Sequence, residues 1–224
     1  MIPLLLPVLG ALLVWVAVST STWLWMWPAA VVLATSVVYL VGVPRVFGKR
    51  RDGTLAWYAW LPWGPLFAYQ WAVHALTRAL TAEPVATEVM PGVWVARRPR
   101  VRELPPDIAI VIDLCAEFPA ARGITEGRAY LAIPTLDATA PTPLEIVQAV
   151  EAVLSANGAA FVHCAFGHGR SATVAAAIMI RRGHATLDDV EARMRATRPR
   201  IGLNSRQRAA LAEATKAWQA NAPR

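Results

Sequence analysis

Charge and cysteine are both scarce in this chain of 224 residues. No Asp, Glu, Lys or Arg occurs between Met1 and Pro44, so this stretch cannot supply the charged surface of an ordinary soluble domain. With only two cysteines, Cys115 and Cys164, a disulfide framework of the secreted kind is excluded and a reducing compartment is expected. The net charge of +7 is scattered in single residues and pairs apart from Lys49-Arg50-Arg51, so binding to nucleic acid is not expected.

Residues 1–80 have the composition of a membrane region. Two uncharged stretches, about 2–18 and 23–43, precede the first arginine, and the second is long enough for a helix that crosses a bilayer. The first is marginal in length, and a cleaved signal peptide is its alternative interpretation, although it lacks a basic n-region. Eight of the ten tryptophans precede residue 80, which is typical of side chains at the level of the lipid headgroups.

A third apolar stretch, 55–73, is rich in aromatic residues but contains Pro62 and Pro65 near its middle. We expect it to lie in the membrane interface, and a third span is the alternative. The basic residues from Arg45 to Arg51 favour the inner side of the membrane. Two spans would then leave everything downstream in the cytoplasm, whereas a third would place it outside. The sequence therefore predicts an integral membrane protein whose C-terminal domain is cytoplasmic.

After a linker at 81–90, short apolar stretches alternate with helical patterns, which is typical of an α/β domain over 91–224. We expect a central, largely parallel sheet of four or five strands flanked by helices. The expected strands are 93–96, 108–114, 129–133 and 160–163, and the expected helices are 143–155, 170–182, 186–197 and 204–220. A capping box, Thr142-Pro-Leu-Glu145, marks the start of the first of these helices.

The last expected strand runs through Cys164 into a loop with two glycines and then into the helix that begins near Arg170. A strand, a tight loop and a helix N-terminus make an anion cradle, because backbone N–H groups converge and the helix dipole adds positive potential. Such a cradle favours the thiolate form of Cys164. The planar guanidinium of Arg170 can bind two phosphoryl oxygens. The segment thus offers both a nucleophile and a phosphate clamp.

The run from His163 to Ser171, His-Cys-x5-Arg-Ser, resembles the signature of the cysteine-based protein tyrosine and dual-specificity phosphatases, and the resemblance extends from about Pro91 to Trp218. It implies that Cys164 is the nucleophile, that Arg170 binds phosphate, that Ser171 assists the sulfur as a leaving group and that His163 holds the loop. The phosphate-binding loop residues are Ala165, Phe166, Gly167, His168, Gly169 and Arg170. No metal or other cofactor is expected, since the arginine and the amides neutralise the phosphoryl charge.

Asp137 is the only acidic residue between Glu126 and Glu145, and it matches the aspartate loop of the resembled family. It is expected to act as general acid and then as general base. Asp113 and Glu117, on or beside an apolar strand, are expected to support the core or the loop instead. By the same resemblance Asn204 supports the site. His168 stays open between a reader of an anionic headgroup and a neutral filler of the loop.

Cys115 ends an expected strand next to the one that carries Cys164. It is either a small buried residue or, as the resemblance implies, a redox partner that forms a disulfide with the oxidised nucleophile.

The sequence thus predicts a phosphomonoester hydrolase with a cysteinyl-phosphate intermediate. The expected substrate is a phosphorylated protein at the membrane, as for a tyrosine or dual-specificity phosphatase. A lipid phosphatase acting on phosphatidylglycerophosphate or a phosphoinositide is the alternative, and an inactive phosphate-binding adaptor is the remote one.

Overall fold

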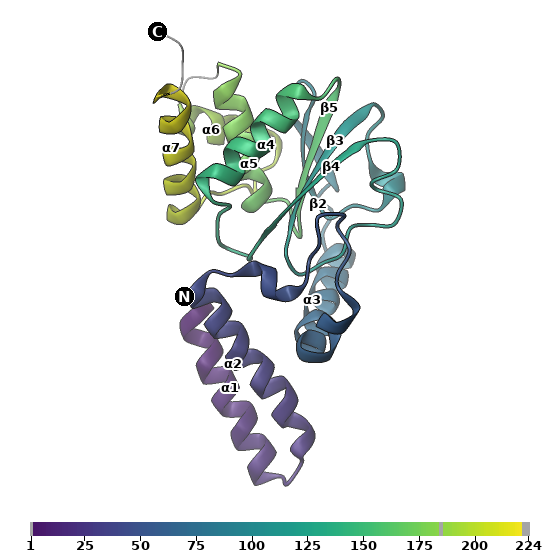
Figure 1. The fold of residues 1–224 in the computed structure, drawn as a ribbon, viewed down its shortest axis with the longest axis vertical. Helices are drawn as coiled ribbons and strands as arrows, with labels where there is room; N and C mark the ends of the chain where they lie inside the picture. Colours follow the sequence, from purple (N-terminus) through teal and green to yellow (C-terminus); the bar gives the residue numbers. More distant parts are fainter. Residues whose placement is uncertain (1, 184–185, 221–224) are drawn as a thin grey trace. The chain divides into compact units, whose positions relative to one another are not determined.

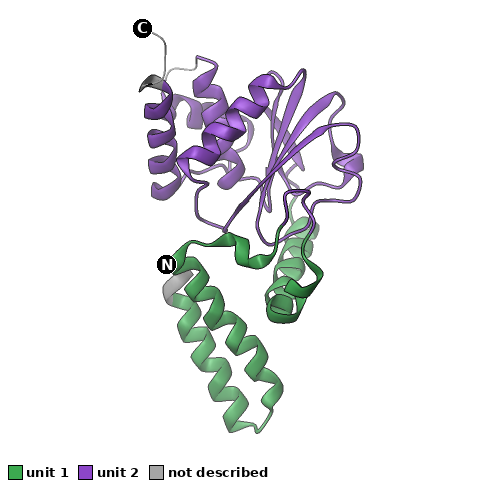
Figure 2. Ribbon diagram, viewed as in Figure 1, with its two compact units in different colours: residues 1–49, 55–81 green, residues 50–54, 82–224 purple. Residues whose placement is uncertain are grey.

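The computed structural model describes residues 2–183 and 186–220, so residues 184–185 and 221–224 of the expected phosphatase domain lie outside the described part. The chain divides into two compact units (Figure 2). The first comprises residues 1–49 and 55–81, and the second comprises residues 50–54 and 82–224.

The first unit begins with two apolar helices, α1 (Ile2–Ser19) and α2 (Met26–Val41), which form an antiparallel hairpin (Figure 1). The helices approach closely at Gly10, where a Cβ atom would lie only 2.6 Å from Cδ2 of Leu33. Large apolar side chains of both helices are exposed on the outside of the hairpin. Within the described residues, one helical stretch, Trp23–Val41, is long and apolar enough to cross a membrane, while the apolar helix at Leu5–Ser19 is shorter.

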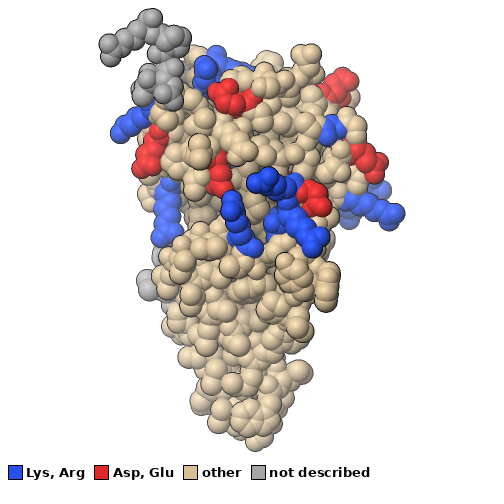
Figure 3. All heavy atoms as spheres, in the orientation of Figure 1, with Lys and Arg blue, Asp and Glu red and all other residues tan. Residues whose placement is uncertain are grey.

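The aromatic stretch 55–73 forms a 3₁₀ turn (Trp57–Ala59) and most of α3 (Trp60–Leu80), which continues through Pro65. An aromatic cluster fixes its start, because the ring centroids of Phe47 and Trp63 lie 4.9 Å apart and Trp63 Nε1–H donates to the carbonyl oxygen of Val46 at 2.9 Å. Figure 3 shows acidic and basic side chains interspersed over the second unit, whereas the surface of the α1–α2 hairpin carries none.

A five-stranded mixed sheet forms the centre of the second unit, in the order β1-β2-β5-β3-β4 (Figure 1). The strands are β1 (Ala86–Met90), β2 (Val93–Arg97), β3 (Ile108–Cys115), β4 (Ala129–Thr135) and β5 (Ala159–Cys164). β1 and β2 are antiparallel, and the other neighbours are parallel. The sequence predicted four of these strands to within two residues. It missed β1, which lies inside the stretch expected to be a linker, because Glu88 interrupts any apolar run there.

Four helices lie on one side of this sheet (Figure 1): α4 (Pro143–Ser155), α5 (Arg170–Arg181), α6 (Leu187–Thr197) and α7 (Ser205–Ala220), of which α7 packs against α4 and α5. All four begin within one residue of the expected position, and side-chain caps mark the starts of α4, α6 and α7. Thr142 and Glu145 form the expected capping box of α4, and Thr186 Oγ1 accepts the backbone N–H of Asp189 at the start of α6.

The sheet has a core on each face, because successive strand residues point to opposite sides. On the helix side, Ile112 and Val162 pack with Ile146 of α4 and Ile178 of α5. On the other side, Val111 and Phe161 of the strands are covered by Ile124 from the segment between β3 and β4. Since β3 and β5 are parallel, their C-terminal ends lie at one edge of the sheet, where the candidate site is found.

Candidate active site

The loop between β5 and α5 is held against β2 by its glycines. Gly167 has φ +78°, and a Cβ atom at this position would lie 2.6 Å from the backbone carbon of Ala96, so a larger residue would push the loop off the strand. Gly169 precedes the first residue of α5, Arg170. The strand, loop and helix N-terminus expected from the sequence are therefore all present, and they place Cys164 at the base of the loop.

Cys164 is almost completely buried, and polar groups of its own loop contact its sulfur. The backbone N–H of Gly167 donates to Sγ at 3.2 Å, and Ser171 Oγ lies 3.4 Å from it. These two groups lie where they can hydrogen-bond negative charge on the sulfur. The structure thus brings together the sequence-predicted residues Cys164, Gly167 and Ser171.

Arg170 is buried, and hydrogen-bond acceptors contact both terminal nitrogens of its guanidinium group. Its Nη1 and Nη2 atoms donate to Oε2 and Oε1 of Glu117 at 2.9 and 2.7 Å, and Nη1 also donates to the carbonyl oxygen of Thr135 at 2.7 Å. Burial by itself lowers the pKa of Arg170, but the charges of Glu117 and Asp137 raise it well above its ordinary value. Within the described residues, Nε has no hydrogen-bond partner. The guanidinium therefore stays charged and keeps a donor for a ligand.

Asp137 reaches the same guanidinium from the loop that follows β4. Its Oδ1 lies 3.1 Å from Nη2 of Arg170, and its side chain is 45% exposed. The next residue, Ala138, has φ +57°, a backbone conformation that is unfavourable for a residue with a Cβ atom. Asn204 and Gln207 hold this loop, because their side-chain amides donate to the carbonyl oxygens of Ala138 and Thr139, both at 2.9 Å.

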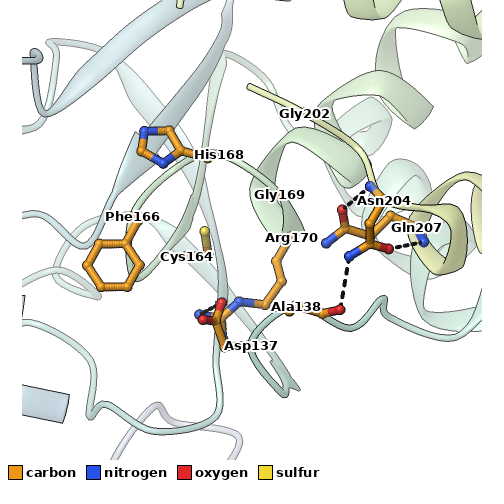
Figure 4. Close-up of a pocket in the computed structure, with 10 residues that line it drawn as sticks. All are labelled: Asp137, Ala138, Cys164, Phe166, His168, Gly169, Arg170, Gly202, Asn204 and Gln207. Carbon is orange, nitrogen blue, oxygen red and sulfur yellow. Dashed lines mark hydrogen bonds and ion pairs between the residues drawn. The ribbon is translucent and has the colours of Figure 1, made fainter. Parts of the chain in front are cut away.

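These residues line a pocket of about 280 Å³ (Figure 4). The sulfur of Cys164 and the side chains of Asp137 and Arg170 converge in it, and Phe166 and His168 form the opposite side. Asn204 lines the pocket from the start of α7, where its side chain also accepts the backbone N–H of Gln207 at 3.0 Å. Asn204 thus contacts the loop that carries Asp137, and its expected supporting role would act on that loop.

His168 contacts an acid that the sequence did not single out. Its Nε2 atom lies 2.7 Å from Oε2 of Glu83. Glu83 also lies 3.4 Å from Nε of Arg198, whose guanidinium donates to the carbonyl oxygens of Gly167 and Phe166 at 3.0 and 3.3 Å. Burial lowers the pKa of Arg198, while the charge of Glu83 opposes the change. Arg198 therefore holds the backbone of the phosphate loop, and Glu83 contacts both Arg198 and His168 of that loop.

His163, Asp113 and Cys115 form a buried cluster with Tyr130. Tyr130 donates to Oδ2 of Asp113 at 2.6 Å, the backbone N–H of Cys115 donates to Oδ1 at 2.9 Å, and Nε2 of His163 lies 3.8 Å from Oδ1. Burial and the neighbouring Asp113 raise the pKa of Tyr130 above its ordinary value. Asp113, Cys115 and His163 offer three possible metal ligands within 4.8 Å of one another. The cluster lies where β3 pairs with the strand that carries Cys164, since Asp113 and His163 are register partners.

Neither Cys115 nor Cys164 forms a disulfide in this structure. Leu114 and Cys164 belong to the helix-side core, whereas Cys115 lies with Asp113 and His163. The Cys115–Cys164 disulfide therefore stays a prediction. Cysteine mapping after mild peroxide treatment would test it.

The sequence did not single out Glu83 or Gln207. Gln207 could have been found, since it follows Asn204 by three residues in the spacing of a helix cap. Glu83 could not, because nothing near it in the chain relates it to a loop 85 residues away.

A buried thiol at the base of an anion-binding loop, a buried arginine and a carboxylate facing them define a cysteine-dependent phosphatase. Residues 105–217 match the family model of the dual specificity phosphatase catalytic domain, and the chain belongs to this family. It is accordingly a metal-independent phosphatase that uses a cysteine. No curated protein is similar to the chain at a significant level.

Solved structures support this fold. Tk-PTP in its active form is 29% identical, with a TM-score of 0.52 over 59% of this chain and 97% of that chain. A mouse putative dual specificity phosphatase in complex with zinc tungstate is 25% identical, with a TM-score of 0.51 over 62% of this chain and 92% of that one. PTPMT1 in complex with PI(5)P is 22% identical, with a TM-score of 0.56 over 62% of this chain and 99% of that one.

Proposed function

We propose that the chain hydrolyses phosphomonoesters through a cysteinyl-phosphate on Cys164. The observation that carries the proposal is the position of Cys164 Sγ, which accepts the N–H of Gly167 in the pocket that Arg170 and Asp137 also line. Nε of Arg170 is buried and has no partner among the described residues, so it is available to a phosphoryl oxygen. Backbone amides from Ala165 to Arg170 would complete the binding of phosphate.

In the first step the thiolate of Cys164 attacks phosphorus. A sulfur–phosphorus bond forms, the bond from phosphorus to the ester oxygen breaks, and Asp137 gives its proton to that oxygen. In the second step a water attacks phosphorus, Asp137 takes the proton of the water, and the sulfur leaves as thiolate. Ser171 Oγ, 3.4 Å from Sγ, stabilises the departing sulfur by a hydrogen bond.

The proposed substrate is a phosphorylated protein side chain. The residue after the nucleophile, Ala165, is buried and apolar, and Glu83 occupies Nε2 of His168. A carboxylate so close to the loop disfavours a second phosphate of a polyanionic headgroup at His168. His168 is therefore proposed as a support of the loop.

A lipid phosphatase is the second candidate, and two observations favour it. The fold is similar to that of PTPMT1, which has been solved in complex with PI(5)P. In addition, the α1–α2 hairpin exposes large apolar side chains that a bilayer would cover.

Phosphate release from a panel of phosphopeptides and from phospholipid vesicles, measured side by side with the full chain, tests the choice of substrate. We expect a higher kcat/KM on the peptides. Turnover of lipid alone would contradict the proposed substrate without affecting the chemistry at Cys164.

We also propose that α1 and α2 anchor the chain in a membrane with the catalytic domain in the cytoplasm. The helices contain no charged residue and expose apolar side chains on their outer surface, whereas the core helix of a soluble protein would bury them. The basic residues from Arg45 to Arg51 follow α2 directly. A topology reporter fused after Arg224 should show that this end of the chain is cytoplasmic. The mature chain should also keep the residues that a signal peptidase would remove. A reporter that lies outside the membrane would instead mean that residues 55–73 cross it.

A further inference from the structure

A second cavity, of about 530 Å³, lies in the catalytic unit and is lined by four arginines, Arg98, Arg100, Arg102 and Arg122. The remaining lining residues that the structure describes are uncharged, so none of them offsets this positive charge. Four arginines around one concavity raise the local concentration of anions more than the same charges on an open surface would.

Arg98 is held in place by residues of the segment that follows β3. Its Nε and Nη2 atoms donate to the carbonyl oxygen of Pro119 at 3.2 and 3.0 Å, and its guanidinium carbon lies 5.5 Å from the centre of the Phe118 ring. Arg100, Arg102 and Arg122 are exposed, and no ion pair among the described residues involves their guanidinium groups.

Two acids lie near the rim of this cavity. Glu103 accepts the backbone N–H of Arg100 at 2.7 Å, and the carboxylate of Glu126 lies within 4 Å of where a Cβ atom of Gly123 would be. Two carboxylates leave an excess of two positive charges, even if both are counted against the four arginines.

A backbone hydrogen bond links a residue of this cavity to the phosphate loop. The N–H of Arg98 donates to the carbonyl oxygen of Ala165, the residue after the nucleophile, at 3.3 Å. Phe118 and Pro119, which hold Arg98, directly follow Glu117, which holds Arg170. The segment from Glu117 to Pro119 thus holds one arginine of the catalytic pocket, Arg170, and one of the second cavity, Arg98.

From this arrangement we infer that the arginine cavity is a second phosphate-binding site, separate from the loop that binds the scissile phosphate. Guanidinium groups bind phosphate through two parallel hydrogen bonds, and three of them here are available. The family resemblance does not assign the site, since the family match begins at residue 105 and three of the four arginines precede it. The phosphate is either free in solution or a second group on the phosphorylated substrate.

The first test measures thermal unfolding of the full chain with and without inorganic phosphate, against chloride at equal ionic strength. The variant is Arg100→Ala/Arg102→Ala/Arg122→Ala, and the matched control, Arg181→Ala/Arg182→Ala/Arg193→Ala, loses the same charge from exposed positions on or next to α5 and α6. Phosphate in the catalytic loop stabilises all three proteins alike. We expect the rise in Tm to be smaller by about 2 °C in the cavity variant than in wild type and control. Equal shifts in all three proteins would overturn the inference.

The second test identifies the source of the phosphate, by comparing KM for peptides of one sequence with one or two phosphorylated residues. If the second phosphate belongs to the substrate, the cavity variant should raise KM about tenfold for the doubly phosphorylated peptide alone. An unchanged KM together with the lost thermal shift assigns the site to free phosphate. Turnover of p-nitrophenyl phosphate should be unchanged in both variants, which separates failure of this inference from failure of the catalytic proposal.

Discussion

Glu117 binds both terminal nitrogens of Arg170, with Oε2 2.9 Å from Nη1 and Oε1 2.7 Å from Nη2. The two side chains are 5% and 1% exposed, so the pair is removed from water. Because Glu117 binds the two terminal nitrogens of the guanidinium, Nε is the nitrogen that is left for a ligand. The carboxylate thus sets the orientation of the phosphate clamp and favours its charged form.

Glu117→Gln should destabilise the fold and impair catalysis. Removing one charge from a buried pair costs roughly 3 kcal/mol, because the other charge stays buried without its partner. Denaturant unfolding and kcat/KM measure the two effects. Glu151→Gln is the matched control, since Glu151 is 53% exposed and lies 4.0 Å from Arg181. That change should alter stability by less than about 0.5 kcal/mol. Equal effects of the two substitutions would contradict the assigned role of Glu117.

Asn204→Ala should slow turnover more than its effect on stability explains. The substitution removes a helix cap, worth about 1 kcal/mol, and also the hydrogen bond that holds Ala138 beside the general acid. Thr186→Ala removes a cap of the same kind at α6, away from the pocket. We expect similar losses of stability in the two variants but a lower kcat only in Asn204→Ala. If kcat is unchanged in both, Asn204 is a cap and nothing more.

Asp137→Asn should lower kcat by about 10²–10⁴ on phosphopeptides, the usual share of general acid catalysis. The loss should be smaller with p-nitrophenyl phosphate, because its leaving group needs less protonation. Steady-state kinetics on both substrates checks the difference. An equal loss on both would mean that Asp137 acts through its ion pair with Arg170 and not as the acid.

The second unit was largely predictable because its signals are local. Alternating apolar strands, caps such as Thr142 and the glycines around the nucleophile each act within a few residues, and they locate the strands, the helices and the phosphate loop. The place of Ser171 beside Cys164 came from the family resemblance, and the structure has both residues on one continuous segment, at the end of β5 and in the first turn of α5.

The contacts that brace the site were not predictable in this way. Glu83 meets His168 across 85 positions, and Glu117 meets Arg170 across 53, so only the folded chain shows them. β1 was missed for a related reason: Glu88 is charged, and the strand forms because β2 offers it a hydrogen-bonding edge. In β1, hydrogen bonding to β2 outweighs the weak preference of the residues themselves for a strand.

The cysteinyl-phosphate on Cys164 is the central claim, and trapping it is the most direct test. The enzyme is mixed with excess phosphotyrosyl peptide, quenched in denaturant within the first turnover and analysed by intact mass and peptide mapping. We predict one added phosphate, on the peptide that contains Cys164, and neither this adduct nor phosphate release in Cys164→Ser, whose hydroxyl is a far weaker nucleophile at neutral pH. Turnover by Cys164→Ser at the wild-type rate, or a phosphate trapped on a different residue, would contradict the account.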